Sequence, residues 1–425
     1  MVKEFLLNVF LLFIFTQASC PNEDTVDKCT VDEIVMDEIS GSFASSIILQ
    51  DSVVKSNGIR NQYNNCYISS VLQALYHLPS VRNFIMRHES NNIVHIGLNI
   101  FFYRLATGDG PQELSVEFLR IMQGIMKNDG APFKIGSYND VSEFWQWLME
   151  SIKTLQDRFF AIETHRWHEV VGINMLQKIQ KENRVLVQVL ANPDTSIDKL
   201  MVNPVQVNLN LYRRDLQQEY VMDDEDGSIT ILDKLSSLGV FDDKKDKKTV
   251  TCLQHTAFSS LPPILAIQAS KFDDQHLKQG LSSIWRNDVT TIYPTKFTLN
   301  DQAYHLHAMI IYRKSHYMTR TCIDVATDTW ALFDDSTVSP SSMNEPFRED
   351  EHPYWFFYVQ HNVREQWKQA EFRKAPVSDK IAAMAQSIKA SYDGLLHLAK
   401  LLRKNVKLDV LDIEPPPAAE LFMEL

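Results

Sequence analysis

The sequence predicts an α+β protein, because helical and strand-like periodicity occupy different parts of the chain. In the first half, apolar residues recur at helical spacing in segments such as 69–86 and 140–159. From about Val205 the period changes to two, which is typical of strands. With 425 residues and 44% hydrophobic content, the chain can fill the core of one large domain or two ordinary ones.

Two helices are expected in the first half, and Pro79 should end the first apolar run. The helical positions are Val71, Leu72, Leu75 and Leu78 in one segment and Phe144, Trp147, Leu148 and Ile152 in the other. In the second half, six segments predict strands: VQVNLNLY, SITILDKL, LPPILAIQASKF, YHLHAMIIY, TWALFDD and YWFFYVQ. The charged runs DDEDGS and FDDKKDKK between them indicate solvated loop tips. The first half is therefore expected to be helical and the second mostly sheet.

The N-terminus predicts a secretory signal peptide over residues 1–19, followed by a linker over 20–55. The apolar run from Phe5 to Phe15 is followed by small residues that could frame a cleavage site. An apolar N-terminal helix or a misassigned start is the alternative. The chain contains no Asn-x-Ser/Thr acceptor, and a free thiol suits a reducing compartment, so localisation stays open between the secretory pathway and the cell interior. No segment predicts a stable membrane anchor.

The net charge and the motifs of the sequence limit the classes of partner and cofactor that the protein is expected to bind. A net charge of -12 argues against a nucleic-acid binder, whose affinity rests on basic residues, and favours a basic protein partner. The sequence has no phosphate-binding GxxxxGK loop and no HExxH pair. Cys252 and His255 have ligand spacing, but no second pair follows, so we expect no metal and no cofactor. The five cysteines contain no CxxC pair: Cys20, Cys29, Cys66, Cys252 and Cys322.

Cys66 opens the helical segment NQYNNCYISSVLQALYHL. A helix N-terminus offers unpaired N–H groups and a positive dipole end, and both stabilise a thiolate. The side-chain amide of Asn61, five residues earlier, could donate to a developing oxyanion. The alternative is a buried cysteine at the start of a core helix. The segment alone does not decide between a nucleophile and a structural residue.

A histidine and two carboxylates in the second half favour the nucleophile. His316 follows one predicted strand, and Asp334 and Asp335 end another. Two neighbouring antiparallel strands would bring the imidazole beside a carboxylate, which would fix its tautomer and leave the other ring nitrogen for the proton of Cys66. Taken singly, a loop histidine and an Asp-Asp-Ser turn would be ordinary surface features.

Five blocks together resemble the ubiquitin-specific protease family. The segment GIRNQYNNCYISSVLQALYHL is similar to the cysteine box of that family, and YHLHAMIIYRKSHY with WALFDDSTV resembles its histidine box. Three further blocks, NDVSEFWQWLMESI, LPPILAIQASKF and PYWFFYVQ, follow the family's pattern in the same order. The resemblance covers roughly residues 57–361.

The resemblance implies a papain-like cysteine protease fold and hydrolysis of the isopeptide or peptide bond after the C-terminal glycine of ubiquitin. It implies a catalytic domain over 56–361, with a helical thumb at about 57–204, fingers at about 205–256 and a palm at about 257–361. A helical tail would follow over 362–425. The implied partners are ubiquitin and ubiquitinated proteins, the expected oligomeric state is a monomer, and the family location is cytoplasm or nucleus.

The resemblance also assigns roles residue by residue. It implies Cys66 as nucleophile, His316 as general base, Asp334 as its orienting partner with Asp335 as a second candidate, Asn61 at the oxyanion position, and Asp140 and Glu143 at the ubiquitin tail. The two tail carboxylates lie about one helical turn apart and would face a basic peptide together.

The sequence departs from the family pattern at several positions. Tyr63 and Ser315 stand where the family usually has glycine, the loop between Tyr304 and His316 is shorter than usual, and QASKF keeps only its phenylalanine. The fingers lack both CxxC pairs, so they must be held by packing. Two alternatives to an active deubiquitinase follow. One is a weak or inactive ubiquitin-binding module, and the other is a secreted papain-type general protease.

Overall fold

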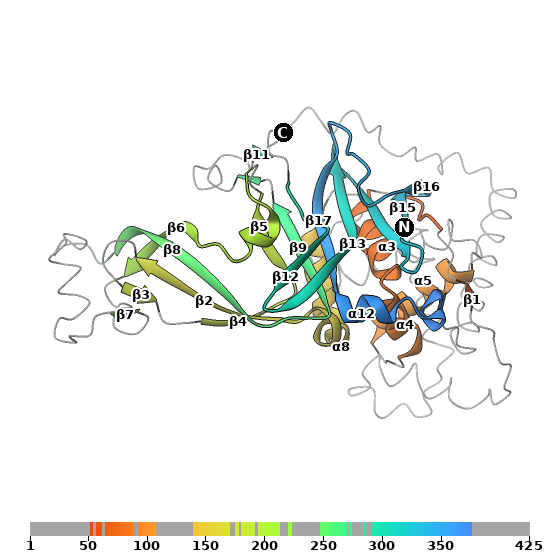
Figure 1. Ribbon diagram of the computed structural model, residues 1–425, viewed down its shortest axis with the longest axis horizontal. Coiled ribbons are helices and arrows are strands. Elements are labelled where there is room, and N and C mark those ends of the chain that lie inside the picture. The colour runs from red at the N-terminus through yellow and green to blue at the C-terminus, as the bar shows by residue number, and fades with distance from the viewer. Residues whose placement is uncertain are drawn as a thin grey trace, which may run out of the picture.

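The computed structural model describes most of the chain between residues 52 and 375, and Figure 1 gives the arrangement of its elements. The expectations for the leader, for most of the linker, for SITILDKL, for Tyr63 and for residues beyond 375 lie outside the described residues. Among the described residues, no helix combines the length and apolar character needed to cross a membrane. The described residues are 52–53, 57–61, 64–88, 90, 92–107, 139–170, 175–177, 180–191, 194–212, 220–222, 247–270, 272–273, 284–285 and 291–375.

Helices form in both segments where the apolar spacing predicts them, and an additional helix over Ile93–Thr107 was not predicted. The main ones are α3 (Cys66–Tyr76), α4 (Pro79–Arg87), α5 (Ile93–Thr107) and α7 (Val141–Ser151), and α7 continues into α8 (Lys153–Leu155) and the π-helical turn η1 (Gln156–Phe160). Pro79 is the first residue of α4, where its missing N–H costs no helical hydrogen bond. All residues of α3 are buried, so this helix runs through the interior.

A large sheet lies against these helices (Figure 1). Its strand order is β16-β15-β14-β13-β17-β9-β5, with β12 also paired to β13, and every pairing is antiparallel except β5 with β9. The strands are β5 (Val187–Leu190), β9 (Ile264–Ser270), β12 (Lys296–Leu299), β13 (Gln302–Arg313), β14 (His316–Asp324), β15 (Thr329–Asp334), β16 (Thr337–Ser341) and β17 (His352–Gln360). The short helix α9 (Ile197–Leu200) follows β5.

A second sheet extends away from this body, on the left in Figure 1. Its order is β6-β8-β2-β3-β7, with β4 paired to β2. The strands are β2 (Ile162–Val170), β3 (Met175–Gln177), β4 (Gln180–Arg184), β6 (Val205–Tyr212), β7 (Tyr220–Met222) and β8 (Lys247–Ser260). A two-stranded ladder pairs β10 (Phe272–Asp273) with β11 (Ile284–Trp285).

Strands β2 to β5 lie between residues 162 and 190, so the expectation of a purely helical first half, with strands only from about Val205, was wrong. The reason lies in the composition of β2. Its buried positions include Thr164 and His168, and charged residues alternate with them. An apolar-polar alternation is the signal of a half-buried strand, and it is hidden where polar residues occupy the buried face.

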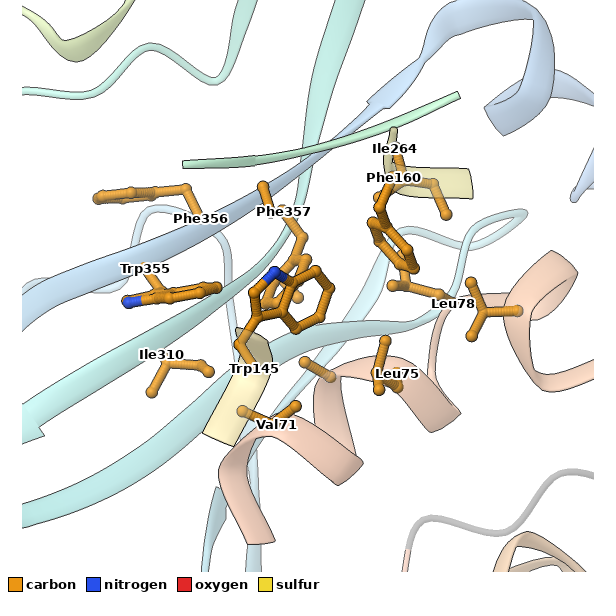
Figure 2. Close-up of a cluster of buried hydrophobic side chains, with 14 of the residues drawn as sticks. Val71, Leu75, Leu78, Trp145, Phe160, Ile264, Ile310, Trp355, Phe356 and Phe357 are labelled. Atoms are coloured by element: carbon orange, nitrogen blue, oxygen red, sulfur yellow. The ribbon is translucent and has the colours of Figure 1, made fainter. Parts of the chain in front are cut away.

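The core lies between α3, α7 and the large sheet, and Trp145 of α7 stands at its centre (Figure 2). Its ring packs edge-on against Phe160, Trp355 and Phe357, with centroid distances of 4.8, 5.6 and 5.4 Å. Its indole Nε1 donates to the carbonyl of Val185 at 3.1 Å, so burial leaves the polar atom satisfied. This packing fixes α7 against the sheet.

Two hydrogen bonds fix α3 on strands β13 and β14. The hydroxyl of Thr319 donates to the carbonyl of Ser70 at 2.8 Å, and Nε2 of His307 donates to the carbonyl of His77 at 2.7 Å. All four residues are buried. Burial, with the nearby positive charges of Arg82 and Arg364, lowers the pKa of His307 to about 4, so the ring is neutral at pH 7 and carries this bond without a charge.

The chain beyond β17 packs back onto the helices as a strap, defined here as residues 361–375. It contains α12 (His361–Gln366), the 3₁₀ turn η3 (Ala370–Arg373) and β18 (Lys374–Ala375). Strand β18 pairs with β1 (Ser52–Val53), and Arg82 of α4 donates to the carbonyl of Phe372 at 2.6 Å. The expected helical tail is therefore helical only at its start within the described residues.

Trp367 anchors the strap. Its side chain is buried, its ring packs edge-on against His307 at 5.1 Å, and its Nε1 donates to the hydroxyl of Ser80 at 2.6 Å.

We predict that Trp367→Ala lowers the free energy of unfolding by about 3–5 kcal/mol, because it leaves a cavity and an unpaired hydroxyl. Urea denaturation measures the loss.

Lys368→Ala is the matched control for Trp367→Ala. Lys368 is the next residue, and its side chain is exposed and paired only with Glu365 on the surface. Its removal should change stability by less than about 0.5 kcal/mol. Equal effects of the two substitutions would contradict an anchoring role for the strap.

Candidate active site

Cys66 is the first residue of α3 and is buried. The helix starts there because the carbonyl of Asn65 accepts the N–H groups of Ile68 and Ser69, each at 3.0 Å. The backbone N–H of Asn65 in turn donates to Oδ1 of Asn61 at 3.1 Å. Cys66 therefore stands at the positive end of the helix dipole, in the position that the sequence predicts.

His316 is the first residue of β14 and reaches both Cys66 and Asp334. Its side chain interacts with that of Cys66, and its Nε2 lies 2.7 Å from Oδ1 of Asp334 at the end of β15. The carboxylate thus takes one ring nitrogen and leaves Nδ1 for the thiol. The structure brings the three predicted residues together from α3, β14 and β15.

A two-residue turn places the imidazole. Arg313 and His316 are partners across the β13–β14 ladder, and Lys314 and Ser315 between them have φ angles of 45° and 63°. Two consecutive left-handed residues match the twist of a tight antiparallel hairpin. The segment YHLHAMIIY is part of strand β13 as predicted, and the connection between β13 and β14 is only these two residues.

The pKa of His316 is raised to about 9. Burial alone lowers it, but the hydrogen bonds to Cys66 and Asp334, together with the negative charge of Asp335, outweigh the burial. The ring is therefore held as an imidazolium over the physiological range. An imidazolium beside a thiol can stabilise the thiolate and later return a proton.

Asp335 follows Asp334 in the sequence and also contacts the imidazole of His316. Its Oδ2 lies 3.7 Å from Nε2 of His316, and its side chain accepts a hydrogen bond from the amide of Asn61. Burial raises the pKa of Asp335, while His316 and Asn61 oppose that shift. Asn61 is thus bound at both ends of its amide, to Asp335 and to the N–H of Asn65.

Gly58 belongs to the site, although the sequence analysis did not single it out. The N–H of Ile59 donates to the carbonyl of Asp335 at 2.8 Å, so this segment lies directly on the turn after β15. A Cβ at Gly58 would lie 2.5 Å from the backbone of Ser336 and 2.6 Å from the carbonyl of Asp335. Only glycine permits this approach, and its place at the head of the cysteine box was the available signal.

Asp140 and Glu143 lie on α7 as predicted, but Asp140 has partners within the chain. Oδ1 of Asp140 caps the helix by accepting the N–H of Ser142 at 2.7 Å. Oδ2 accepts the hydroxyls of Tyr354 at 3.0 Å and Tyr317 at 3.3 Å. Glu143 is exposed, and partial burial and the charge of Asp140 raise its pKa. A peptide contacting Asp140 would share its oxygens with two tyrosines.

Two further features noted in the sequence were the loop before Cys66, where the family usually has a glycine, and the ligand spacing of Cys252 and His255. In the described part of the loop before Cys66, the left-handed residue is Asn64, with φ of 56°. Cys252 and His255 lie three residues apart on β8, hence on opposite faces, and His255 instead contacts Glu169 at 3.0 Å.

The described residues contain one group of donors close enough to hold an ion. Ligand atoms of His316, Asp334 and Asp335 lie within 4.8 Å of one another. Oδ1 of Asp334 already accepts from His316, and Arg313 brings a positive charge to within 3.3 Å of Oδ2. These contacts suit proton transfer better than binding of a cation.

A family model for ubiquitin carboxyl-terminal hydrolases matches residues 57–358, which is most of the chain and contains all the site residues described above. The chain belongs to this family. Ubiquitin carboxyl-terminal hydrolase 11 of Schizosaccharomyces pombe is 24% identical to it over 323 residues, covering 72% of this chain and 86% of the relative.

A solved structure supports the fold independently. It contains the SAGA DUB module, with Ubp8, Sgf11, Sus1 and Sgf73, bound to monoubiquitin. The TM-score is 0.54 at 16% identity, and the match covers 75% of this chain and 72% of the other. The predicted α+β fold of a ubiquitin-specific protease catalytic domain is confirmed.

The contact at Gly58 yields a prediction. We expect Gly58→Ala to displace the turn carrying Asp335, because the new methyl group meets backbone rather than a flexible side chain. The free energy of unfolding should fall by about 1–3 kcal/mol, measured by urea denaturation, and the reactivity of Cys66 should fall with it. Arg60→Ala, at an exposed position two residues away, is the control and should leave both unchanged.

Proposed function

We propose that this family member is an active cysteine-type deubiquitinase that hydrolyses the isopeptide or peptide bond after the C-terminal glycine of ubiquitin. The observation that carries the proposal is that His316 interacts with the thiol of Cys66 while its Nε2 is hydrogen-bonded to Asp334. Membership of the ubiquitin carboxyl-terminal hydrolase family and the likeness to a ubiquitin-bound module support the choice of substrate.

In the first half of the proposed reaction, His316 holds the proton of Cys66, and the thiolate sulfur attacks the carbonyl carbon of the terminal glycine. The carbonyl oxygen becomes an oxyanion. When the carbon–nitrogen bond breaks, His316 gives its proton to the leaving amine, which departs as a lysine side chain or an N-terminus, and a thioester remains on Cys66. Asp334 keeps the imidazole oriented throughout.

In the second half, His316 takes a proton from water, whose oxygen attacks the thioester carbonyl. The carbon–sulfur bond then breaks, the sulfur recovers its thiolate beside the imidazolium, and ubiquitin leaves with a free carboxyl group, which loses its proton to water. Asn61 is proposed to stabilise both oxyanions. Its amide carries two N–H groups, and Asp335 can occupy one while the other faces the substrate.

Asp140 and Glu143 are proposed to receive the ubiquitin tail, whose basic side chains suit two carboxylates on one helix. The hydroxyls of Tyr317 and Tyr354 hold Oδ2 of Asp140. In this arrangement Asp140 is ordered before substrate arrives, which lowers the entropy lost on binding. Glu143 is exposed and supplies the second charge.

A ubiquitin probe with a C-terminal electrophile tests the proposal. We predict that the full chain forms a covalent adduct with the probe and that Cys66→Ala abolishes it, with adduct formation followed by mass spectrometry. Probe binding without an adduct would instead indicate an inactive ubiquitin-binding module. Cleavage of casein at a rate similar to that of ubiquitin conjugates would indicate a general protease.

The raised pKa of His316 predicts the alkaline limit of activity. Because the imidazolium persists to about pH 9, the rate of ubiquitin-amide hydrolysis should decline only as pH rises through that value. The same proton stabilises the fold below the ordinary histidine pKa, and that contribution is lost as pH passes 9. Asp334→Asn should move the limit to lower pH, because it removes the negative partner. An unchanged limit in this variant would contradict the assignment.

A further inference from the structure

Arg313, the last residue of β13, lies between the carboxylates of Asp334 and Glu351. Its Nη2 is 3.3 Å from Oδ2 of Asp334, and its Nη1 is 3.5 Å from Oε1 of Glu351. We propose that Arg313 is a positioning residue that holds the Asp334 carboxylate in place from an anchor on Glu351. The proposal rests on the proposed function, because it assigns Asp334 a part in that reaction.

Glu351 makes a firm anchor. Its side chain is only 6% exposed, and its Oε2 accepts the backbone N–H of Arg348 at 3.1 Å. A buried carboxylate requires a compensating charge, and the guanidinium of Arg313, itself 23% exposed, supplies one. The segment before β17 and the end of β13 are thereby joined beside the site.

The Asp334 carboxylate has a donor at each oxygen as a result. Oδ1 accepts from His316, and Oδ2 faces Arg313. A carboxylate held at one oxygen can rotate about its side-chain bonds, whereas one held at both keeps the plane in which Oδ1 meets the imidazole. Arg313 would thus act on the imidazole through Asp334, without touching substrate.

The backbone places Arg313 for this role. It pairs with His316 across the β13–β14 ladder, so the two side chains leave the same end of the hairpin. Lys314 and Ser315 between them are both left-handed, a conformation that costs free energy for residues other than glycine. The contact of Arg313 with Glu351 supports the turn against that cost.

Arg313 also affects how firmly the imidazole holds its proton. His316 faces Cys66 from α3, Asp334 from β15 and Asp335 from the following turn. Without Arg313, Oδ2 of Asp334 loses its donor and the carboxylate can turn away from the imidazole, which weakens the contact that keeps the proton on His316. The pH at which His316 loses its proton should therefore fall, in the same direction as for Asp334→Asn, whereas simple destabilisation of the fold would lower activity without moving it.

Two measurements on the full chain test the proposal. The first is ubiquitin-amide hydrolysis between pH 6 and 10.5. The second is the rate at which iodoacetamide alkylates Cys66, followed by mass spectrometry of its peptide over the same range, with an inflection where His316 loses its proton. The variants are Arg313→Gln and Arg313→Lys. Lys314→Gln is the matched control, because Lys314 lies in the same turn but its ammonium pairs with Asp350 at the surface.

Arg313→Gln should lower hydrolysis by about tenfold at pH 7.5 and lower the alkylation inflection by about half a pH unit or more. Arg313→Lys keeps the charge and loses one of the two contacts, so it should keep the inflection and recover part of the rate. Lys314→Gln should match the native chain. The proposal is overturned if the inflection of Arg313→Gln coincides with the native one, or if Lys314→Gln shifts it equally.

Alkylation needs no ubiquitin, so the experiments distinguish failure of the proposed function from failure of the positioning role of Arg313. A native chain that hydrolyses no ubiquitin amide, yet shows the inflection and its shift in Arg313→Gln, contradicts the proposed function and supports the positioning role. A native chain that hydrolyses ubiquitin, with an inflection that Arg313→Gln leaves in place, supports the function and excludes the positioning role.

Discussion

The site depends on the docking of one buried helix against one hairpin. Helix α3 meets β13 and β14 through the Thr319–Ser70 and His307–His77 hydrogen bonds, and both lie in the dry interior. Hydrogen bonds there have no competing water, and leaving a partner unpaired would be costly. The helix therefore has little freedom to slide along the strands. Because Cys66 begins this helix, its distance from the start of β14 is set by contacts several residues away.

Two tight turns at the ends of strands in the large sheet complete the arrangement of the active site. One turn precedes His316, and the other follows Asp334, and each connects its strands with two residues. Such turns fix strand register, so the imidazole and the carboxylate arrive at neighbouring strand ends together. Asp335 in the second turn has φ of 52°, and its carbonyl accepts the N–H of Ile59 at the start of the cysteine box. One short segment thus connects the loop of Cys66 to the carboxylates.

The sequence predicted two helical segments, the long strands of the second half and the meeting of Cys66, His316 and Asp334, because each carries a local pattern or a family block. It did not predict β2, whose buried Thr164 and His168 break the apolar alternation. It also missed Arg313, since a charged residue beside a hairpin turn is usually solvated and nothing in the sequence places Glu351 opposite. The intramolecular partners of Asp140 come from strands far along the chain, so no local pattern contains them.

The strap shows why the folded unit extends past the family match, which ends at residue 358. Trp367 packs on His307, the same side chain whose Nε2 binds the C-terminal end of α3. The strap thus buries one of the two hydrogen bonds that hold the helix of Cys66. Its pairing with β1 then joins the chain after the last palm strand to the chain before the cysteine box. Segments before and after the family match therefore both contribute to the packing around α3. These residues outside the family pattern help to hold the thiol beside its base.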